Sequence, residues 1–414
     1  MIRRLQELDA ELRVLALFVV LAGVGWWLRS TPLAIIGSLA AVTTLALYVW
    51  QRDCLSGVSY RRVVGRERAT FGEEVTLGIE IVNDKLLPLS WLHVEDEIPA
   101  ALEIRGGTVV ADDRALVSRL VDVLPLLPYQ RVRRQLTISC SHRGDYLFGP
   151  ARLSSGDPIG FRTRTGRIAG QHHLLVYPKV FALAPDGIAS RMLIGDERTR
   201  TRLLEDPSRI SGVREYRAGD ALRSIDWRAT ARSTGLLVRQ FEPTVSQRVA
   251  LFLDLQVSGR GAFYFEPPAL EFTIAVAASV LTELERRGVA TGLFSSGTIA
   301  GRPLACPPSS SPAQLALMLE SLARVTHFGS LEFAHLLAAE SSRLRPGTSV
   351  VIVSADYPAE TLEALGDLRR RHALSALWVA NDHGAPPPRE HVDALLTARY
   401  ADDWQRRESL ELAA

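Results

Sequence analysis

The chain has 414 residues, a formal net charge of +2 and a hydrophobic fraction of 47%. That length admits two or three domains, and the small net charge gives no electrostatic reason to expect nucleic acid as a partner. Lysine is nearly absent (Lys85 and Lys179 only), so arginine richness by itself says little about function.

Two uncharged apolar runs open the chain. The second, residues 30–51, is long enough to cross a bilayer, which takes about 20 residues. The first, residues 14–28, is shorter, but the flanking Arg13 and Arg29 can extend toward headgroups, and two tryptophans suit an interface. A buried core helix and a cleaved signal peptide are alternatives, and the second run that follows at once disfavours the signal peptide. We therefore predict a transmembrane helical hairpin in residues 1–55, with spans at about 12–28 and 32–50.

Arginines flank these runs unevenly. Several precede the first run and follow the second, whereas the short connection holds only Arg29. The positive-inside rule then places both ends of the chain, and all soluble domains, in the cytoplasm. Three widely spaced cysteines give neither a disulfide framework nor a zinc spacing, which agrees with a reducing compartment.

Short strand-like segments occupy residues 56–180. The segment "EVTLGIEIVN" alternates apolar and smaller or polar residues with a period of two, and "SWLHVEDEIP" and "RRQLTISCS" repeat the pattern. Gly, Pro and Asn-Asp pairs separate the segments. The pattern predicts an Ig-like β-sandwich that serves as a spacer or interaction module.

From residue 248 the pattern changes to buried apolar strands that alternate with helices. It predicts an α/β domain of Rossmann-like organisation in residues 248–414, with a mostly parallel sheet covered on both faces. Sites in such sheets form beyond the carboxyl ends of the strands. The oxygen-bearing candidates there are Asp254, Gln256, Ser258, Ser295, Ser296, Ser330, Ser354 and Asp356. Oxygen ligands of this kind suit Mg²⁺, and the sequence has no Walker-type phosphate loop.

Residues 181–247 join these two domains and contain "GVREYRAGDALRSIDWRATARSTGLLVRQFE". We predict that Asp220 caps a short helix beginning at Ala221, that Arg223 pairs with Asp226, and that "LLVRQFE" is a strand. Leu222, Ile225 and Ala229 would share one helix face, with Trp227 packed beside it.

Three roles are open for this segment. The favoured one is a clasp, in which acids and arginines pair across the junction between the two domains. The second is an arginine-rich surface that docks the carboxylates of a partner. The third is catalysis with Asp220 or Asp226 as the base, which lacks a neighbouring nucleophile.

Four motifs resemble the bacterial family DUF 58 (domain of unknown function 58): "LPLSWLHVEDEIP", "HRGDYLFGPARLSSGDPIGF", "LVYPKV" and, above all, the segment of residues 212–242. The residues that carry the last match are Arg214, Tyr216, Gly219, Asp220, Arg223, Ile225, Asp226, Trp227, Arg228 and Arg232. The resemblance covers nearly everything after the apolar runs. It implies two membrane spans in the bacterial inner membrane, a C-terminal domain related to von Willebrand factor A domains, and genes that accompany MoxR-type AAA+ ATPases.

A von Willebrand A metal site resembles Asp-x-Ser-x-Ser plus a later Thr and Asp. Here Gln256 replaces the first Ser, Ser330 would stand for the Thr, and Asp356 is displaced by one residue. The set Asp254, Ser258, Ser330 and Asp356 is therefore degenerate, and Mg²⁺ demands near-ideal geometry. We predict weak or absent Mg²⁺ binding and no other cofactor, with the alternative that Asp254 caps a turn and Ser258 begins a helix.

Two functions remain. The favoured one is a membrane-anchored, non-enzymatic scaffold or adaptor that binds protein partners, with a MoxR-type AAA+ ATPase as the expected one, in protein-complex assembly or envelope maintenance. The rival is an envelope-associated enzyme of unknown chemistry that uses Asp254 and Asp356. The rival is weaker, because the sequence has no Ser-His-Asp, Cys-His or close paired-carboxylate motif.

Overall fold

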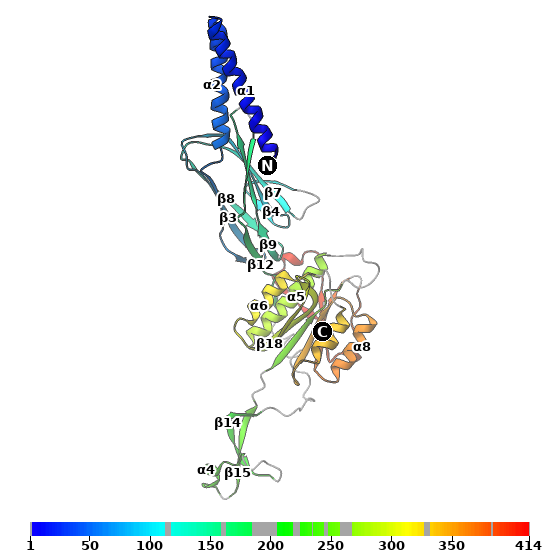
Figure 1. Cartoon of the computed structure of the whole chain (residues 1–414). Helices are drawn as coiled ribbons and strands as arrows, with labels where there is room; N and C mark the ends of the chain where they lie inside the picture. Colours follow the sequence, from blue (N-terminus) through cyan, green and yellow to red (C-terminus); the bar gives the residue numbers. More distant parts are fainter. Residues whose placement is uncertain are drawn as a thin grey trace. The chain divides into compact units, whose positions relative to one another are not determined.

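The computed structural model describes residues 2–111, 117–158, 163–183, 205–217, 224–233, 235–243, 247–256, 267–326, 332–381 and 384–413. These residues form two compact units, Met1–Tyr177 and Pro178–Ala414 (Figure 1). The first unit contains a helical hairpin followed by antiparallel sheets. The second contains a mixed sheet covered by helices.

The chain begins with helices α1 (Ile2–Trp27) and α2 (Thr31–Asp53). They pack through glycines, because a Cβ on Gly25 would lie 2.5 Å from the backbone nitrogen of Ala34. A Cβ on Gly37 would likewise lie 2.6 Å from the backbone nitrogen of Ala22. By length and composition α2 can span a membrane, whereas the apolar part of α1, Arg13–Trp27, is shorter.

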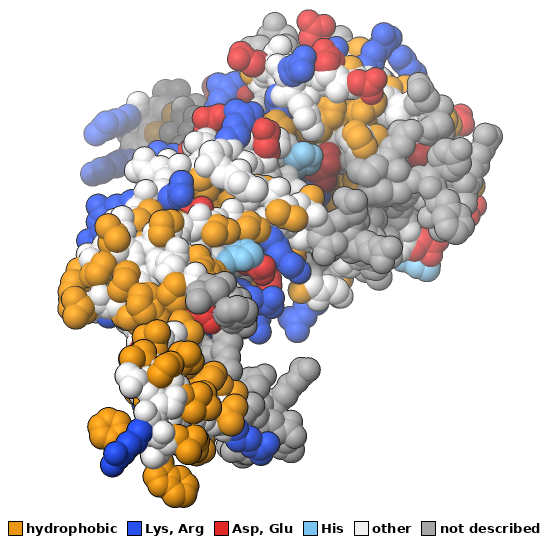
Figure 2. Space-filling view, turned by 90° about the horizontal axis from the view of Figure 1, so that it is seen from above, with side chains coloured by type: hydrophobic (Ala, Val, Ile, Leu, Met, Phe, Trp, Pro, Cys, Tyr) orange, Lys and Arg blue, Asp and Glu red, His pale blue; other side chains and the backbone are white. Residues whose placement is uncertain are grey.

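Large apolar side chains of this hairpin face outward, as the orange surface in Figure 2 shows. Leu39 in the middle of α2 is 66% exposed, and Trp26 and Trp27 at the hairpin turn are each 84% exposed. Such exposure is costly in water and favourable in lipid.

Two antiparallel sheets follow and share one hydrophobic core, as in a β-sandwich; we call them the β domain. The first has the order β1 (Val58–Val64), β3 (Glu74–Asn83), β8 (Arg131–Ser139), β5 (Glu103–Arg105). The second has the order β11 (Thr163–Ile168), β10 (Ala151–Gly156), β4 (Leu89–Pro99), β7 (Val117–Leu126), β6 (Thr108–Val110). A three-stranded sheet adds β2 (Arg68–Ala69), β12 (His172–Val176) and β9 (Gly144–Phe148). Burial alternates along β3, so its predicted period of two is confirmed.

The second unit has a seven-stranded sheet with the order β18 (Arg302–Ser309), β17 (Ala290–Ile299), β16 (Arg248–Leu253), β19 (Ser349–Ser354), β20 (Leu374–Ala380), β21 (Ala394–Arg399), β23 (Leu412–Ala413). The five inner strands are parallel, and the two edge strands are antiparallel to their neighbours. We call this sheet and its helices the α/β domain.

Helices cover both faces of that sheet (Figure 1). α5 (Pro267–Arg286) and α6 (Gln314–Arg324) share a core with one face, and α7 (Phe333–Ser341) and α8 (Ala359–Arg369) with the other. The short strands β13 (Ala182–Leu183) and β22 (Ser409–Leu410) pair beside the sheet, and two 3-10 turns, η2 (Arg389–His391) and η3 (Trp404–Arg406), lie near the C-terminus. The predicted mostly parallel sheet, covered by helices on both faces, is thus present.

Candidate functional site

The predicted strand-end acids lie at the carboxyl edge of the parallel sheet. Asp254 follows β16 directly and is 5% exposed. Its Oδ1 accepts hydrogen bonds from the backbone N–H of Gln256 at 2.9 Å and from Ser296 Oγ at 3.1 Å. Its Oδ2 lies 3.0 Å from Ser354 Oγ at the end of β19. β17 continues past Ser296 to Ile299, so the predicted end of that strand was wrong.

Burial sets the charge of this cluster. Desolvation raises the pKa of Asp254 to about 6, hydrogen bonds from Gln256, Ser354 and Ser296 oppose the rise, and the charge of Asp356 adds to it. The Ser354 hydroxyl also lies 2.6 Å from the carbonyl oxygen of Asp356. A hydroxyl has one hydrogen for these two acceptors, so a protonated Asp254 that donates to Ser354 satisfies all three groups.

The other candidate ligands are also engaged in hydrogen bonds. The Gln256 side-chain oxygen accepts from the backbone N–H of Phe333 at 3.0 Å, at the start of α7. Asp356 Oδ1 accepts from the backbone N–H groups of Tyr357 at 2.9 Å and Ala385 at 3.3 Å. Gln256 therefore acts as a structural link between the sheet edge and a helix start.

These contacts do not fit a Mg²⁺ site. A cation needs an ionised carboxylate, and burial raises the pKa of Asp254 to about 6, so a cation would compete with a proton for this group in mildly acidic solution. Within the described ranges, no group of three His, Cys, Asp or Glu residues could hold a metal ion. Ser258 and Ser330 of the predicted set lie outside the described residues.

The second candidate is the signature hairpin, which we define as β14 (Glu205–Glu215), α4 (Trp227–Thr230) and β15 (Leu237–Pro243). β14 and β15 form an antiparallel pair that is a two-stranded sheet by itself. Ile225 bridges to Val238, and both side chains are 3% exposed. They form a small core at the end of the hairpin.

Several details of this segment differ from the sequence-based expectation. Asp226 caps α4: its Oδ1 accepts from the backbone N–H groups of Arg228 at 3.0 Å and Ala229 at 3.1 Å. Ile225 lies in the β-bridge and not on a helix face. The predicted strand "LLVRQFE" is present as β15. Gly219, Asp220, Leu222 and Arg223 lie outside the described residues.

Trp227 is the clearest correction. It was expected to pack beside the helix, yet it is 65% exposed. Val213 on β14 and Leu236 before β15 are 45% and 44% exposed. The described part of the hairpin thus exposes three large apolar side chains.

The charges of the signature hairpin are mostly at its surface. Asp226 Oδ2 pairs with Arg239 Nε at 3.3 Å, inside the hairpin itself. Backbone hydrogen bonds from Ala229 and Arg228, together with Arg239, lower the pKa of Asp226. The side chains of Arg217, Arg228 and Arg232 are exposed, and those of Arg214 and Tyr216 are half-buried.

Sequence reasoning missed a buried ion pair in the β domain. The guanidinium of Arg62 on β1 forms a salt bridge to Asp96 on β4, with side-chain exposures of 2% and 0%. Tyr60 donates a hydrogen bond of 2.6 Å to the same carboxylate, and Arg62 donates one of 3.0 Å to the carbonyl of Phe148. At the adjacent Gly149, φ is 90° and a Cβ would lie 2.6 Å from the carbonyl oxygen of Gly170.

That ion pair explains two of the motifs that carry the family resemblance. Asp96 belongs to "VEDEIP" and Gly149 to "FGP", and the structure joins them through Arg62. The sequence shows Asp96 as an acid inside an alternating strand. It does not show that Arg62, which lies on another strand, is the partner of this acid. The pair is closed to solvent and is therefore structural.

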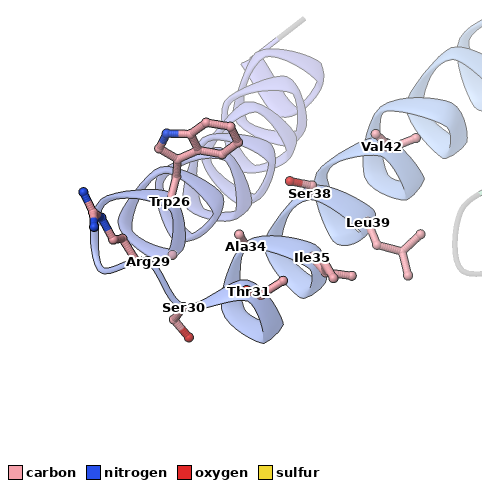
Figure 3. A pocket seen from close by; sticks show the side chains of 10 residues that line it. Trp26, Arg29, Ser30, Thr31, Ala34, Ile35, Ser38, Leu39 and Val42 are labelled. Carbon is pink, nitrogen blue, oxygen red and sulfur yellow. The ribbon is translucent and has the colours of Figure 1, made fainter.

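An open groove lies at the turn of the helical hairpin (Figure 3). Its lining includes Trp26, Arg29, Ile35, Ser38 and Leu39. Arg29 is its one charged side chain, so the groove fits the lipid-facing surface of an anchor better than a reactive site.

Residues 212–390 match the family described as "Protein of unknown function DUF58". The "Uncharacterized protein YeaD" of Bacillus subtilis (strain 168) is 26% identical over 235 residues, which are 53% of this chain and 52% of that protein. The chain thus spans about half the length of this curated relative, and both matches support the DUF58 resemblance.

Similar solved structures include a cohesin module from Clostridium perfringens and the C-terminal domain of wzt. The first is 12% identical and covers 29% of this chain and 96% of that one, with a TM-score of 0.21. The second is 11% identical and covers 30% and 75%, also with a TM-score of 0.21.

Proposed function

We propose that the protein is a membrane-anchored, non-enzymatic scaffold whose signature hairpin docks an acidic protein partner. The observation that carries this proposal is the exposed Trp227 on a two-stranded hairpin. A hairpin of two strands is marginally stable in water, and a hydrophobic partner surface would stabilise it. Tryptophan and arginine are also the side chains that contribute most to binding at protein interfaces.

Charge defines the partner. Arg228 and Arg232 have exposed side chains, whereas Arg239 is paired with Asp226 inside the hairpin. Guanidinium groups bind carboxylates in a bidentate geometry, so an acidic surface with an apolar pocket for Trp227 is complementary. The DUF58 resemblance makes a MoxR-type AAA+ ATPase the expected partner, in protein-complex assembly or envelope maintenance.

The sheet edge supports a scaffold over an enzyme. Asp254 accepts hydrogen bonds from its own domain, and burial raises its pKa to about 6. Asp356 accepts two backbone hydrogen bonds. A catalytic carboxylate needs a free oxygen that faces substrate, and both oxygens of Asp254 are engaged in hydrogen bonds within the domain. In this proposal the α/β domain is a von Willebrand A-like platform that carries the hairpin.

In this proposal an N-terminal anchor holds the scaffold at a membrane. α2 has the length and composition of a span, and Trp26 and Trp27 at the hairpin turn are side chains that favour a bilayer interface. We place both ends of the chain and both folded units in the cytoplasm of a bacterial cell, at the inner membrane, because arginines flank the apolar runs on the outer sides.

Site-specific photo-crosslinking tests this function. The photoreactive residue p-benzoylphenylalanine replaces Trp227 in the full-length protein in cells that also express the MoxR-type ATPase. The matched control places it at Leu317 on α6, which is 52% exposed. The proposal predicts a crosslink to the ATPase at position 227 and none at position 317. Equal crosslinking at both positions, or none at either, would reject the hairpin as the docking element.

A further inference from the structure

Basic side chains of the β domain form hydrogen bonds to the C-terminal end of α2. The ammonium group of Lys85, in the loop after β3, donates hydrogen bonds of 2.7 Å to the carbonyl oxygens of Cys54 and Ser56. Arg164 on β11 donates one to the carbonyl of Arg52, in the last turn of α2. Cations at a helix C-terminus satisfy its free carbonyls and the helix dipole. The helix end and this end of the β domain therefore form one structure.

Two loops at this end expose large apolar side chains. Leu86, in the loop between β3 and β4, is 75% exposed, and Leu127 and Tyr129, between β7 and β8, are each 65% exposed. We call these three residues the loop patch.

The loop patch is held in a fixed shape. Asn83, 0% exposed, donates to the carbonyl oxygens of Leu87 at 3.1 Å and Leu127 at 3.0 Å. The backbone N–H of Tyr129 donates to the carbonyl of Lys85 at 3.3 Å. Both loops are thus bonded to each other and, through Lys85, to the end of α2. A preorganised apolar surface loses little conformational entropy on binding.

Strand register places this patch where α2 ends. Val58, at the start of β1 after α2, is opposite Asn83 at the end of β3. Val82 is opposite Arg131 at the start of β8, so the second loop turns at the same end. If α2 crosses the bilayer, its C-terminal end lies at the surface of the membrane, and the loop patch lies at the headgroups.

We propose that Leu86, Leu127 and Tyr129 insert into the headgroup region of the leaflet from which α2 emerges. Leucine and tyrosine on a rigid loop suit that region, where an apolar body meets a polar boundary. The basic residues near this end are Arg52, Lys85, Arg131 and Arg164, against the acids Asp53, Asp84 and Glu80, and Glu80 pairs with Arg131. The excess of cations favours a leaflet that contains anionic lipid. The β domain then rests on the membrane at a second point besides the helix.

This inference rests on the proposed membrane anchor, and a depth-resolved fluorescence experiment separates the two. The full chain with Cys306 replaced by Ala is reconstituted into vesicles of phosphatidylcholine and phosphatidylglycerol. Single cysteines that carry the environment-sensitive dye NBD replace Leu127 or, for the anchor, Leu39. A third probe replaces Val110, which is 51% exposed on β6 and pairs with Arg119 near the opposite end of β7. The native Cys54 and Cys140 are 0% exposed and stay unlabelled.

We expect the emission of NBD at position 127 to be blue-shifted and to be quenched by lipids that carry a nitroxide on the headgroup. NBD at position 110 should not be quenched. The Leu39 probe should be quenched by lipids with a nitroxide deep in the acyl chain. Deep quenching at Leu39 without headgroup quenching at Leu127 would overturn the loop patch and leave the anchor standing. Loss of quenching at Leu39 would reject the anchor itself. A blue-shifted emission at Leu127 that lipids do not quench, with a shift that grows with protein density, would show that the patch contacts a second copy of the chain. That result would also overturn the proposal.

Discussion

Asp226 and Arg239 face each other from the two arms of the signature hairpin, with 3.3 Å between Oδ2 and Nε. The same carboxylate caps α4 through its other oxygen. One acid thus joins the short helix to β15, inside the hairpin and not between domains. This acid therefore stabilises the hairpin locally, as a docking surface needs.

Replacing Asp226 by Ala should loosen the hairpin without unfolding the α/β domain. The change removes the helix cap and the pair with Arg239, both of which act locally. Hydrogen exchange should become faster at Arg228 and Ala229, while the thermal transition of the α/β domain stays in place. Asp226→Asn keeps a capping side chain and should preserve slow exchange. A large fall in the melting temperature of Asp226→Ala would instead support the clasp between domains.

The Asp254 cluster should make stability depend on pH between about 4 and 6. Burial raises the pKa of this acid from its ordinary value of 3.8 to about 6 in the folded protein. The folded state then binds more protons than the unfolded state. The stabilisation contributed by Asp254 is therefore fully present below pH 3.8 and is lost as the pH rises through about 6. The shift corresponds to about 3 kcal/mol of unfolding free energy.

Asp254→Asn should remove this dependence. Asparagine can accept the hydrogen bond of Gln256 and donate to Ser354, so at pH 8 the variant should be more stable than the wild type. Chemical denaturation at several pH values measures this, with Asp367→Asn on α8, whose native side chain is 77% exposed, as the control. Equal pH profiles for wild type and Asp254→Asn would contradict an elevated pKa.

Glu283 makes stability change with pH in the opposite direction. Its effect on stability must therefore be separated from that of Asp254. Hydrogen bonds from Arg286, and then from Arg287, lower its pKa to about 2. Its contribution is present above the unfolded value of 4.5 and is lost as pH falls through about 2. Measurements above pH 4.5 therefore separate Asp254 from Glu283, and the comparison with Asp254→Asn separates it from His172, whose pKa is lowered by burial.

Millimolar Mg²⁺ should leave the melting temperature nearly unchanged. A ligand stabilises a fold according to its occupancy, and the side-chain oxygens of Asp254 and Gln256 at the sheet edge already accept hydrogen bonds within the domain. Calorimetry with Mg²⁺ and with EDTA compares the two conditions. A rise of several degrees that Asp254→Ala abolishes would show that a metal binds.

Asp96→Ala in the β domain should be strongly destabilising. It leaves Arg62 charged and buried, which costs about 3–5 kcal/mol for a fully enclosed pair. The control is Glu74→Ala, because its pair with Arg105 has side-chain exposures of 61% and 59% and should contribute less than about 1 kcal/mol. Similar unfolding free energies for the two variants would show that Arg62 finds another partner.

Periodicity predicted much of the fold. The alternation in "EVTLGIEIVN" and the helical spacing in "PALEFTIAVAASVLTELERRG" correspond to β3 and α5. The edge strand β18 was not predicted, since the prolines of "RPLACPPS" argue against a strand and are tolerated only at an edge.

The site was less predictable because its contacts are long-range. The sequence showed that Asp254 ends a strand, but its burial among Ser296 and Ser354 depends on strand order. The prediction that Trp227 packs beside a helix was wrong for a related reason. The pattern suggested a longer helix with an apolar face, whereas Ile225 pairs with Val238 in a β-bridge and α4 has only four residues. A helix that short leaves its tryptophan without a core to enter.

The affinity of the full chain for the MoxR-type ATPase tests the central claim most directly. Wild type, Trp227→Ala and the control Leu317→Ala are reconstituted in nanodiscs and titrated with the ATPase. Trp227→Ala should raise Kd by about tenfold or more, because truncation of a central interface tryptophan typically costs about 2 kcal/mol or more. Its melting temperature should stay at the wild-type value, since the side chain is already exposed. An unchanged Kd for Trp227→Ala would contradict the hairpin as a docking surface.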